Sequence, residues 1–281
     1  MDKAKLNPPK TWEELLEQCK QLQMDGISEH PYIGRWMDQT WAIPQQFTND
    51  CFSEGESIFD ENNNPTFKDG GVGFQKVLER YRLMLEKGYV PPDVLSMSDD
   101  RVTFATGRHT FFTADNYNHQ PVSGDPEFSK IAGKVGFAMY PGLTGETLGQ
   151  GAMYYMGNNN IDNERTWRLM RFFGGKADDG KFYMPKLWAQ KAGLGCPYPE
   201  VMNDPDVRAV YEKWVDMEIW NAQSAKSKVR KFAKQLWYPE WESFLIPQIH
   251  EYVAGKIKIG DCIKSLYDKA VTLKQAYPSF G

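Results

Sequence analysis

The sequence predicts an α/β fold, because segments with helical periodicity alternate along the chain with single short segments of strand character. Apolar residues recur every three or four positions in the predicted helices and alternate with other residues in the predicted strands. The chain has 281 residues, enough for two lobes or for one large domain with a buried core. It contains no internal repeat and no low-complexity tract.

The first predicted helix follows two prolines that keep the approach extended. Thr11 is placed to cap this helix, and Glu14, three residues later, completes a capping box. A second helix is predicted from Phe74, where apolar side chains line one face, and Gly88 is placed to end it. Between the two helices, residues 59–71 are typical of turns around one short strand.

Three segments in the middle of the chain have strand character. Residues 107–117 are predicted to form a strand that enters a polar loop. Residues 134–142 alternate apolar side chains toward one face and stop at a Pro-Gly pair. Residues 151–157 follow a glycine-rich loop and are predicted to be a short strand before a second loop.

The C-terminal half is predicted to be mainly helical. A helix is expected from Asn163 to Phe173, and another after Asp204, with Pro205 at its first position. Residues 236–256 are typical of a loop that enters a helix, and residues 260–276 form a last amphipathic helix.

Composition excludes several classes of protein. The formal net charge is −4, and the most basic stretch, residues 226–234, has the pattern of one helix rather than of a tail, which argues against nucleic acid as a partner. No run of about 18 apolar residues is present that would span a membrane. No signal peptide is recognisable at the N-terminus of this sequence.

Four cysteines are widely spaced and fit no metal-binding pattern. They could form two disulfides or remain as four buried thiols, and we favour the thiols. These cysteines are Cys19, Cys51, Cys196 and Cys262. The four histidines also lack ligand spacing, so we expect no metal and no cofactor.

No arrangement of residues predicts catalysis. A glycoside hydrolase needs two carboxylates that face each other across a cleft. The paired acids, Asp99 with Asp100, Asp178 with Asp179, and Glu240 with Glu242, are too close in sequence to be such a pair. We therefore expect no catalytic residue, while an enzyme that acts on oligosaccharides remains an alternative.

Aromatic residues are abundant, with nine Trp among 14% aromatic residues, and three clusters combine rings with polar groups. The clusters are Arg35-Trp36-x-Asp38-x-x-Trp41, Asn116-Tyr117-Asn118 and Trp237-Tyr238-Pro239-Glu240-Trp241. Rings pack on the apolar faces of sugars, and planar polar groups bind hydroxyls. For each single Trp a place in the core is an equally good explanation. Three such clusters in predicted loops favour carbohydrate binding.

The order of motifs resembles that of extracellular solute-binding proteins of family 1, the sugar-binding receptors of ABC importers. The stretch NPPKTWEELLEQCKQLQ resembles the helix after the first crossing between the lobes of these receptors. DDRVTFATGRHTFFTADNY is similar to their strand and ligand-loop motif, and EYVAGKIKIGDCIKSLYDKA to a C-terminal helix. The resemblance covers the whole chain and implies a periplasmic-binding-protein type II fold, like that of maltose-binding protein.

The resemblance also implies a division into lobes. Residues 1–147 and 204–281 would form lobe 2, with a mixed sheet flanked by helices, and residues 148–203 the returning part of lobe 1. In the family, lobe 1 begins with a longer N-terminal region than the one in this sequence. We therefore expect lobe 1 to be present only in part.

By position, the resemblance places ligand contacts on the aromatic clusters and on one residue after the glycine-rich crossing. Tyr117 stands where the family often has a stacking Trp. The residues implied are Arg35, Trp36, Asp38, Trp41, Asn116, Tyr117, Gln150, Trp237, Glu240 and Trp241. We expect Trp36, Tyr117 and at least one of Trp237 and Trp241 to line one concave surface with partly exposed rings.

The implied function is that of the substrate-binding component of an ABC importer, periplasmic or extracellular, which closes on a sugar by a hinge motion and is read by membrane permease subunits. A receptor of the same fold for a non-sugar solute is the further alternative. Without the rest of lobe 1, the apolar side chains of residues 148–203 should stay exposed. We expect this segment to be poorly ordered or to pair with another chain.

Overall fold

The computed structural model describes residues 4–151 and 154–277 and divides the chain into two compact units. Unit 1 comprises Met1–Thr113, Ala138–Gly149 and Asn221–Gly281, and unit 2 comprises Ala114–Phe137 and Gln150–Trp220. The chain therefore passes between the units four times. We call these points the four passages: after residues 113, 137, 149 and 220.

This division differs from the predicted lobes, because residues 114–137 and 204–220 belong to unit 2. The two stretches are joined by packing. A Cβ atom at Gly124 would lie 2.3 Å from the ring of Trp214, so only glycine allows this close approach. Which unit corresponds to which lobe of a receptor stays a prediction.

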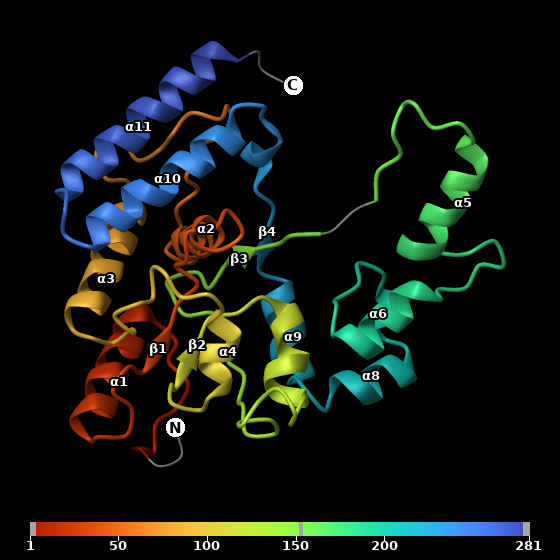
Figure 1. Ribbon diagram of the computed structural model, residues 1–281, viewed down its shortest axis with the longest axis horizontal. Coiled ribbons are helices and arrows are strands. Elements are labelled where there is room, and N and C mark those ends of the chain that lie inside the picture. The colour runs from red at the N-terminus through yellow and green to blue at the C-terminus, as the bar shows by residue number, and fades with distance from the viewer. Residues whose placement is uncertain (1–3, 152–153, 278–281) are drawn as a thin grey trace. The chain divides into compact units, whose positions relative to one another are not determined.

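Unit 1 is built mainly from helices, and its longest two, α10 and α11, pack along each other (Figure 1). Its helices before the first passage are α1 (Trp12–Met24), α2 (Ile43–Ser53), α3 (Phe74–Glu86) and α4 (Asp100–Ala105). Those after the last passage are the 3-10 turn η4 (Lys231–Lys234), α10 (Tyr238–Val253) and α11 (Ile259–Ala276). Helix α9 (Met217–Ser224) contains the fourth passage.

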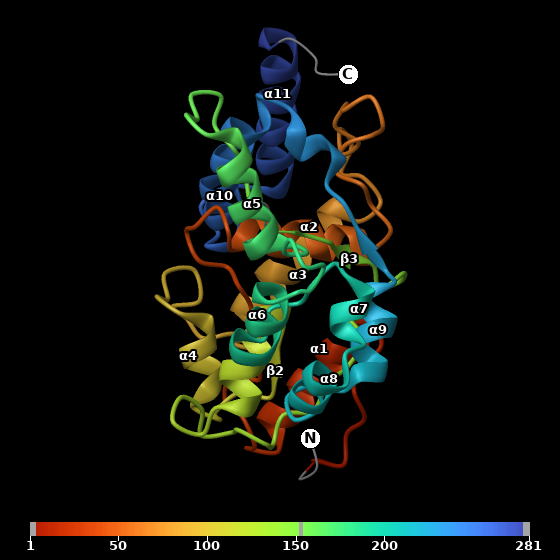
Figure 2. The ribbon, with the colours of Figure 1, turned by 90° about the vertical axis from the view of Figure 1, so that its right-hand side faces the viewer.

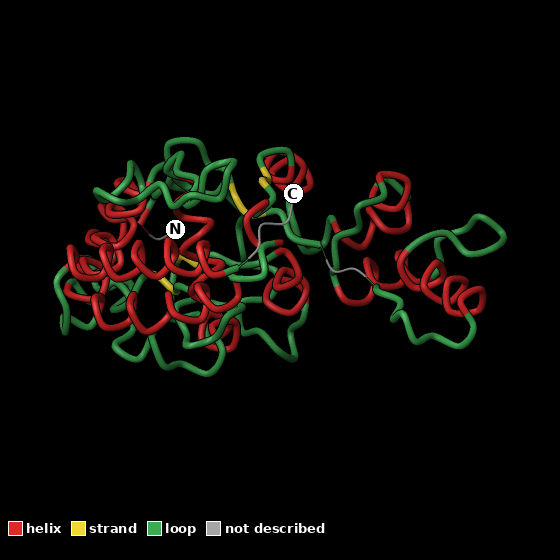
Figure 3. Tube along the Cα trace, turned by 90° about the horizontal axis from the view of Figure 1, so that it is seen from above, coloured by secondary structure: helices red, strands yellow, loops and turns green. Residues whose placement is uncertain are grey.

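Strands are few and short in the described residues (Figure 3). In unit 1, β1 (Tyr32–Ile33) pairs in parallel with β2 (Phe111–Phe112), with Tyr32 opposite Phe111. A second parallel pair joins β3 (Thr147–Leu148) to β4 (Ser227–Lys228), with Thr147 opposite Ser227. The predicted α/β class is confirmed, with a larger share of helix than expected.

Two predicted strands are wrong. Residues 134–142 are not a strand, because their backbone groups bond elsewhere: Tyr140 N–H donates to the Gln223 side chain and Gly142 N–H to the Lys10 carbonyl. Residues 151 and 154–157 are irregular, and residues 152–153, which include Met153, lie outside the described part of the chain. The strand predicted within residues 107–117 is β2.

Local signals placed most helix starts correctly. Thr11 caps α1 and accepts a hydrogen bond from Glu14 N–H over 3.2 Å. Asp204 caps α8 (Pro205–Tyr211), with proline at the first position as predicted. Gly88 lies just beyond α3 at φ +67°, a conformation that favours glycine. The helices α2, α4, α6 (Met184–Ala192), α7 (Pro199–Met202) and α9 were not predicted.

The core of unit 1 is a continuous series of aromatic rings. The ring of Trp36 lies 4.4 Å from Tyr81, and Phe67 stacks on Phe74 with centroids 4.0 Å apart. Phe59 continues the series to Trp237 and Trp241, at 5.2 and 4.9 Å. Loops, α2, α3 and α10 all contribute, so these rings join segments that are far apart in the sequence.

Unit 2 contains short helices and a smaller core (Figure 2). Its elements are the turns η2 (Asn116–Asn118) and η3 (Gln120–Gly124), and the helices α5 (Asn163–Gly174), α6 (Met184–Ala192), α7 (Pro199–Met202) and α8. Helix α6 packs against α5, α7 and α8. The core lies around Tyr211 and Trp214, and no residue of α5 is buried.

All four cysteines are free, as favoured from the sequence, and three of them are fully buried. Burial raises the pKa of the Cys19 and Cys262 thiols to about 12, so these two are unreactive near neutral pH. Among the described residues, the helices are either too short or too polar to cross a membrane.

Candidate functional site

The loop between β1 and α2 holds the first predicted cluster. Arg35 is buried beneath it, and its Nε lies 2.9 Å from Asp100 Oδ2 in α4. The guanidinium carbon lies 5.2 Å from the ring centroid of Trp41. The Trp41 side chain is 43% exposed, and Asp38 is exposed nearby in the same loop. The loop therefore presents an aromatic ring and a carboxylate, with a buried arginine behind the ring.

Trp36 is not a surface residue, and its predicted role as an exposed stacking ring is wrong. It is fully buried against Tyr81 and Tyr32. Its orientation is fixed from two sides, because His250 Nε2 at the end of α10 lies 2.7 Å from the Trp36 carbonyl and a Cβ at Gly34 would lie 2.5 Å from the indole. The ring closes the core under the loop.

Trp237 and Trp241 are also core residues, which corrects the third predicted cluster. Helix α10 begins at Tyr238, so Trp237 and Trp241 lie one turn apart on its inner face. Both contact Phe59, and the Trp241 indole N–H donates to the Leu266 carbonyl of α11 over 3.0 Å. A buried Trp usually needs such a polar partner. Both indole rings are therefore buried, and their predicted contact with a ligand stays a prediction.

Glu240 lies between these two rings in sequence but points to solvent. Its carboxylate accepts a hydrogen bond from Lys269 of α11 over 2.6 Å. This bond lowers the pKa of Glu240. Glu240 therefore joins α10 to α11 on the surface, and its predicted ligand role stays a prediction.

The second cluster begins unit 2. Tyr117 in η2 is 36% exposed, in keeping with a surface ring, while the side chain of Asn116 lies outside what the structure describes. Asn118 is buried, and neither atom of its amide has a hydrogen-bond partner among the described residues. Gln150, also in unit 2, is exposed directly after the third passage.

The exposed part of the predicted site therefore consists of Asp38, Trp41 and Glu240 in unit 1 and of Tyr117 and Gln150 in unit 2. The expectation that Trp36 and a C-terminal Trp line a common concave surface is wrong. The reason is that aromatic rings at the ends of α10 and β1 complete the core of unit 1.

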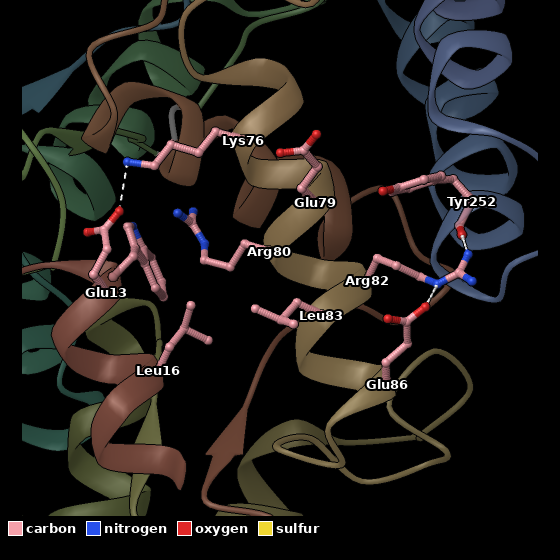
Figure 4. A pocket seen from close by; sticks show the side chains of 10 residues that line it. Glu13, Leu16, Lys76, Glu79, Arg80, Arg82, Leu83, Glu86 and Tyr252 are labelled. Atoms are coloured by element: carbon pink, nitrogen blue, oxygen red, sulfur yellow. Dashed lines mark hydrogen bonds and ion pairs between the residues drawn. The ribbon is translucent and has the colours of Figure 1, made fainter.

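The sequence analysis missed a groove of about 390 Å³ on unit 1, between α1, α3 and the end of α10 (Figure 4). Leu16, Leu83 and Tyr252 give it an apolar floor. Its charged side chains are already engaged, since Lys76 bonds Glu13 over 2.9 Å and Arg82 pairs with Glu86.

The acidic pairs are engaged by basic side chains. Burial raises the pKa of Asp100, which is paired with Arg35, and Asp178 pairs with Arg168 over 2.6 Å. Glu242 pairs with Arg230 over 2.7 Å. Each of these acids thus has a basic partner. Within residues 4–151 and 154–277, no group of His, Cys, Asp or Glu could hold a metal ion.

Solved structures of solute-binding proteins have the same fold as this chain. The maltose-bound MalE3 protein of T. maritima is 21% identical, with a TM-score of 0.72 over 96% of this chain and 66% of that one. A ribitol complex of an ABC transporter solute-binding protein from Agrobacterium radiobacter K84 is 19% identical, with a TM-score of 0.73 over 98% and 67%.

UgpB from Mycobacterium tuberculosis, in complex with glycerophosphocholine, is 14% identical, with a TM-score of 0.74 over 98% of this chain and 66% of that one. The chain thus spans about two thirds of the length of the solved structures that it matches. A comparison with curated protein sequences found no match.

The model of the bacterial extracellular solute-binding protein family matches residues 1–180. This is more than half of the 281 residues, and the order of motifs in the sequence led to the same family. The chain therefore belongs to the bacterial extracellular solute-binding proteins.

Proposed function

We propose that this protein is the substrate-binding component of an ABC importer and that it binds a sugar, an oligosaccharide or a related polyhydroxyl solute. Three findings support the proposal: the family, the maltose and ribitol bound by proteins of the same fold, and the exposed ring of Trp41. Binding without catalysis is also in keeping with acidic pairs that are each engaged by a basic side chain.

Trp41 is the observation that carries the proposal. Arg35 holds the ring by a cation–π contact at 5.2 Å, and Arg35 is itself fixed by the buried ion pair with Asp100. A ring held in this way loses little side-chain entropy on binding. It can stack on a sugar face, while Asp38 accepts hydrogen bonds from hydroxyl groups.

Tyr117 and Gln150 are proposed as the contacts from unit 2, with Asn116 beside them. A ligand that contacts both units stabilises the closed arrangement relative to the open one and so shifts the population toward closure. The permease subunits of the importer would then recognise the closed form at the outer face of the membrane. No bond is made or broken, and the proposed location is periplasmic or extracellular.

The test is isothermal titration calorimetry with maltose, ribitol and glycerophosphocholine. If maltose or ribitol binds, Trp41→Ala should raise its Kd by about ten-fold or more, equivalent to about 1.4 kcal/mol. Trp167→Ala removes a ring of α5 that is 54% exposed and serves as the control that leaves Kd unchanged. Equal Kd values for Trp41→Ala and the native protein would contradict the proposed stacking role.

A receptor for a non-sugar solute is the second candidate, favoured by the glycerophosphocholine complex of a protein with the same fold. In the same titrations, heat with glycerophosphocholine and none with the two polyhydroxyl ligands would replace the first proposal by the second. An enzyme would instead release products from an oligosaccharide panel, and we expect none.

Self-association through residues 148–203 stays a prediction. Helix α5 exposes Trp167, Leu169 and Phe172, and contiguous apolar surface favours association with a partner. We expect a second copy to cover this surface. Light scattering during size exclusion should detect a dimer, and Leu169→Lys should convert it to a monomer. A native protein that is monomeric at every concentration would contradict this prediction.

A further inference from the structure

The four passages between the units begin at one connected set of side chains in unit 1. Thr113 is the last residue before the first passage, Tyr140 and Thr147 lie between the second and third, and Gln223 follows the fourth. Two residues of α2 connect them. We call this set the passage network: Gln46, Asp50, Thr113, Tyr140, Thr147 and Gln223.

Gln46 connects the first passage to the second. Its Oε1 accepts a hydrogen bond from Thr113 Oγ1 over 2.8 Å, and its Nε2 donates to the Tyr140 hydroxyl over 2.6 Å. Gln46 Nε2 also donates to Asp50 Oδ1 over 2.9 Å, and the Tyr140 hydroxyl donates to the same oxygen. Gln46 and Asp50 are buried, so water does not compete for these bonds.

Gln223 connects the second, third and fourth passages with a single amide. Its Oε1 accepts from Tyr140 N–H over 2.8 Å. Its Nε2 donates to the Gly145 carbonyl over 3.0 Å and to Thr147 Oγ1 over 3.1 Å. Gln223 belongs to α9, the helix that contains the fourth passage. One side chain therefore bonds three positions of segment 138–149.

The Gln223 amide supplies hydrogen bonds that neighbouring strands supply in a β-sheet. Segment 138–149 contributes only the two residues of β3 to a strand pair, so Tyr140 N–H has no strand partner. A buried backbone group that loses its hydrogen-bond partner keeps its desolvation penalty without compensation. Replacing Gln223 by an apolar residue would leave three polar groups of the segment without this partner.

Asp50 anchors the network electrostatically. Arg80 Nη2 of α3 lies 3.6 Å from Asp50 Oδ2, and Arg80 Nη1 lies 2.6 Å from Glu54, so the arginine is shared by two acids. The guanidinium also lies 4.0 Å from the Trp12 ring centroid. Of these two acids, Asp50 lies in α2 and Glu54 directly follows that helix. Side chains of α1, α2 and α3 therefore hold the network in place from the core of unit 1.

We propose that the passage network holds the unit 1 ends of all four passages rigidly together, and we call this rigid set of side chains and backbone the frame. Relative motion of the units is then confined to the backbone dihedral angles directly beyond the frame. Gln223 is then a positioning residue, which sets the direction of motion without touching a ligand. The use of this motion for closure on a solute rests on the proposed function, but the frame itself does not.

The experiment measures the distance between the units without any ligand. Spin labels are placed at the exposed positions Lys20→Cys of α1 and Lys191→Cys of α6, in a Cys196→Ser background, and distances are measured by pulsed electron resonance. Gln223→Leu should widen the distance distribution relative to the native network. An unchanged distribution in Gln223→Leu would overturn the proposal.

Gln18→Leu is the matched control. It makes the same chemical change in unit 1 and removes a side-chain bond to the Asn7 carbonyl, outside the network. Its distribution should equal that of the native protein, and an equal widening in both variants would also overturn the proposal. If Gln223→Leu does not fold, Thr147→Val, which removes one of the three bonds, takes its place with a smaller widening.

Titration with maltose separates this inference from the proposed function. If Gln223→Leu widens the distance distribution but the protein binds none of the ligands tested, the frame is supported and its role in solute uptake is rejected. Binding with an unchanged distribution in Gln223→Leu would keep the receptor and reject the frame.

Discussion

Helix α11 of unit 1 and helix α5 of unit 2 are both amphipathic, yet they are used in opposite ways. Five residues of α11 are buried, including Leu266 and Leu273, and α11 packs along α10. None of the 12 residues of α5 is buried, although Trp167, Met170 and Phe173 lie on it. Amphipathic sequence therefore makes a helix, but partners from elsewhere in the chain decide whether its apolar face is covered.

The largest expected difference between the units concerns tryptophan. Trp241→Ala removes a buried ring and a bonded indole N–H from the core of unit 1 and should lower its free energy of unfolding by about 3–5 kcal/mol. In the monomer, Trp167→Ala removes an exposed ring from unit 2 and should change stability by less than about 0.5 kcal/mol. Urea denaturation followed by circular dichroism measures both. Similar losses would mean that α5 is covered in solution.

Ion pairs should show the same contrast. Arg35→Met leaves Asp100 buried without its partner and should destabilise unit 1 by about 3–5 kcal/mol. Arg165→Met breaks a pair with Asp162 that is open to solvent in unit 2, worth about 0–1 kcal/mol. The urea midpoints of Arg35→Met and Arg165→Met, each compared with that of the native protein, provide the measurement. High salt should reduce only the effect of Arg165→Met, because its ion pair is open to solvent.

Acid should affect unit 2 through His119. Its ring lies 4.9 Å from Phe137 and 5.6 Å from Trp220, and burial lowers its pKa to about 4. The unfolded chain binds a proton near pH 6.5 and the folded unit only near pH 4. This contribution is therefore complete above pH 6.5 and is lost as the pH falls toward 4, by about 3 kcal/mol.

Thermal unfolding between pH 7 and pH 4.5, monitored by a probe in unit 2, checks this prediction. His119→Gln removes the titrating ring and should flatten the pH dependence in that range, while the native midpoint falls. An unchanged slope in the variant would show that other groups of unit 2 cause the acid effect.

Helix caps should not distinguish the units, because a cap is a local interaction. Thr11→Ala in α1 and Asp162→Ala in α5 each remove a side chain that accepts a backbone N–H, over 3.2 and 2.9 Å. Each should cost about 1 kcal/mol. Hydrogen exchange of the first turn of each helix is the measurement. A much larger cost in α1 would indicate that its cap also supports tertiary packing.

The sequence by itself determined the helices with strong local signals and the family. Caps such as Thr11 and Asp204 and the glycine at 88 act over a single turn, so they can be recognised from neighbouring residues alone. The order of motifs along the chain indicated the solute-binding protein family, because motif order can be recognised without knowing which residues are in contact.

Only the tertiary structure decided which aromatic residues are available to a ligand. Trp36 and Trp41 are five positions apart in one loop, yet the first is buried by Tyr81 and the second is exposed above Arg35. Tyr81 is 45 positions from Trp36 in the sequence. Asp100, which fixes Arg35, is 65 positions from Arg35. Burial depends on such distant partners, and composition around a ring does not reveal them.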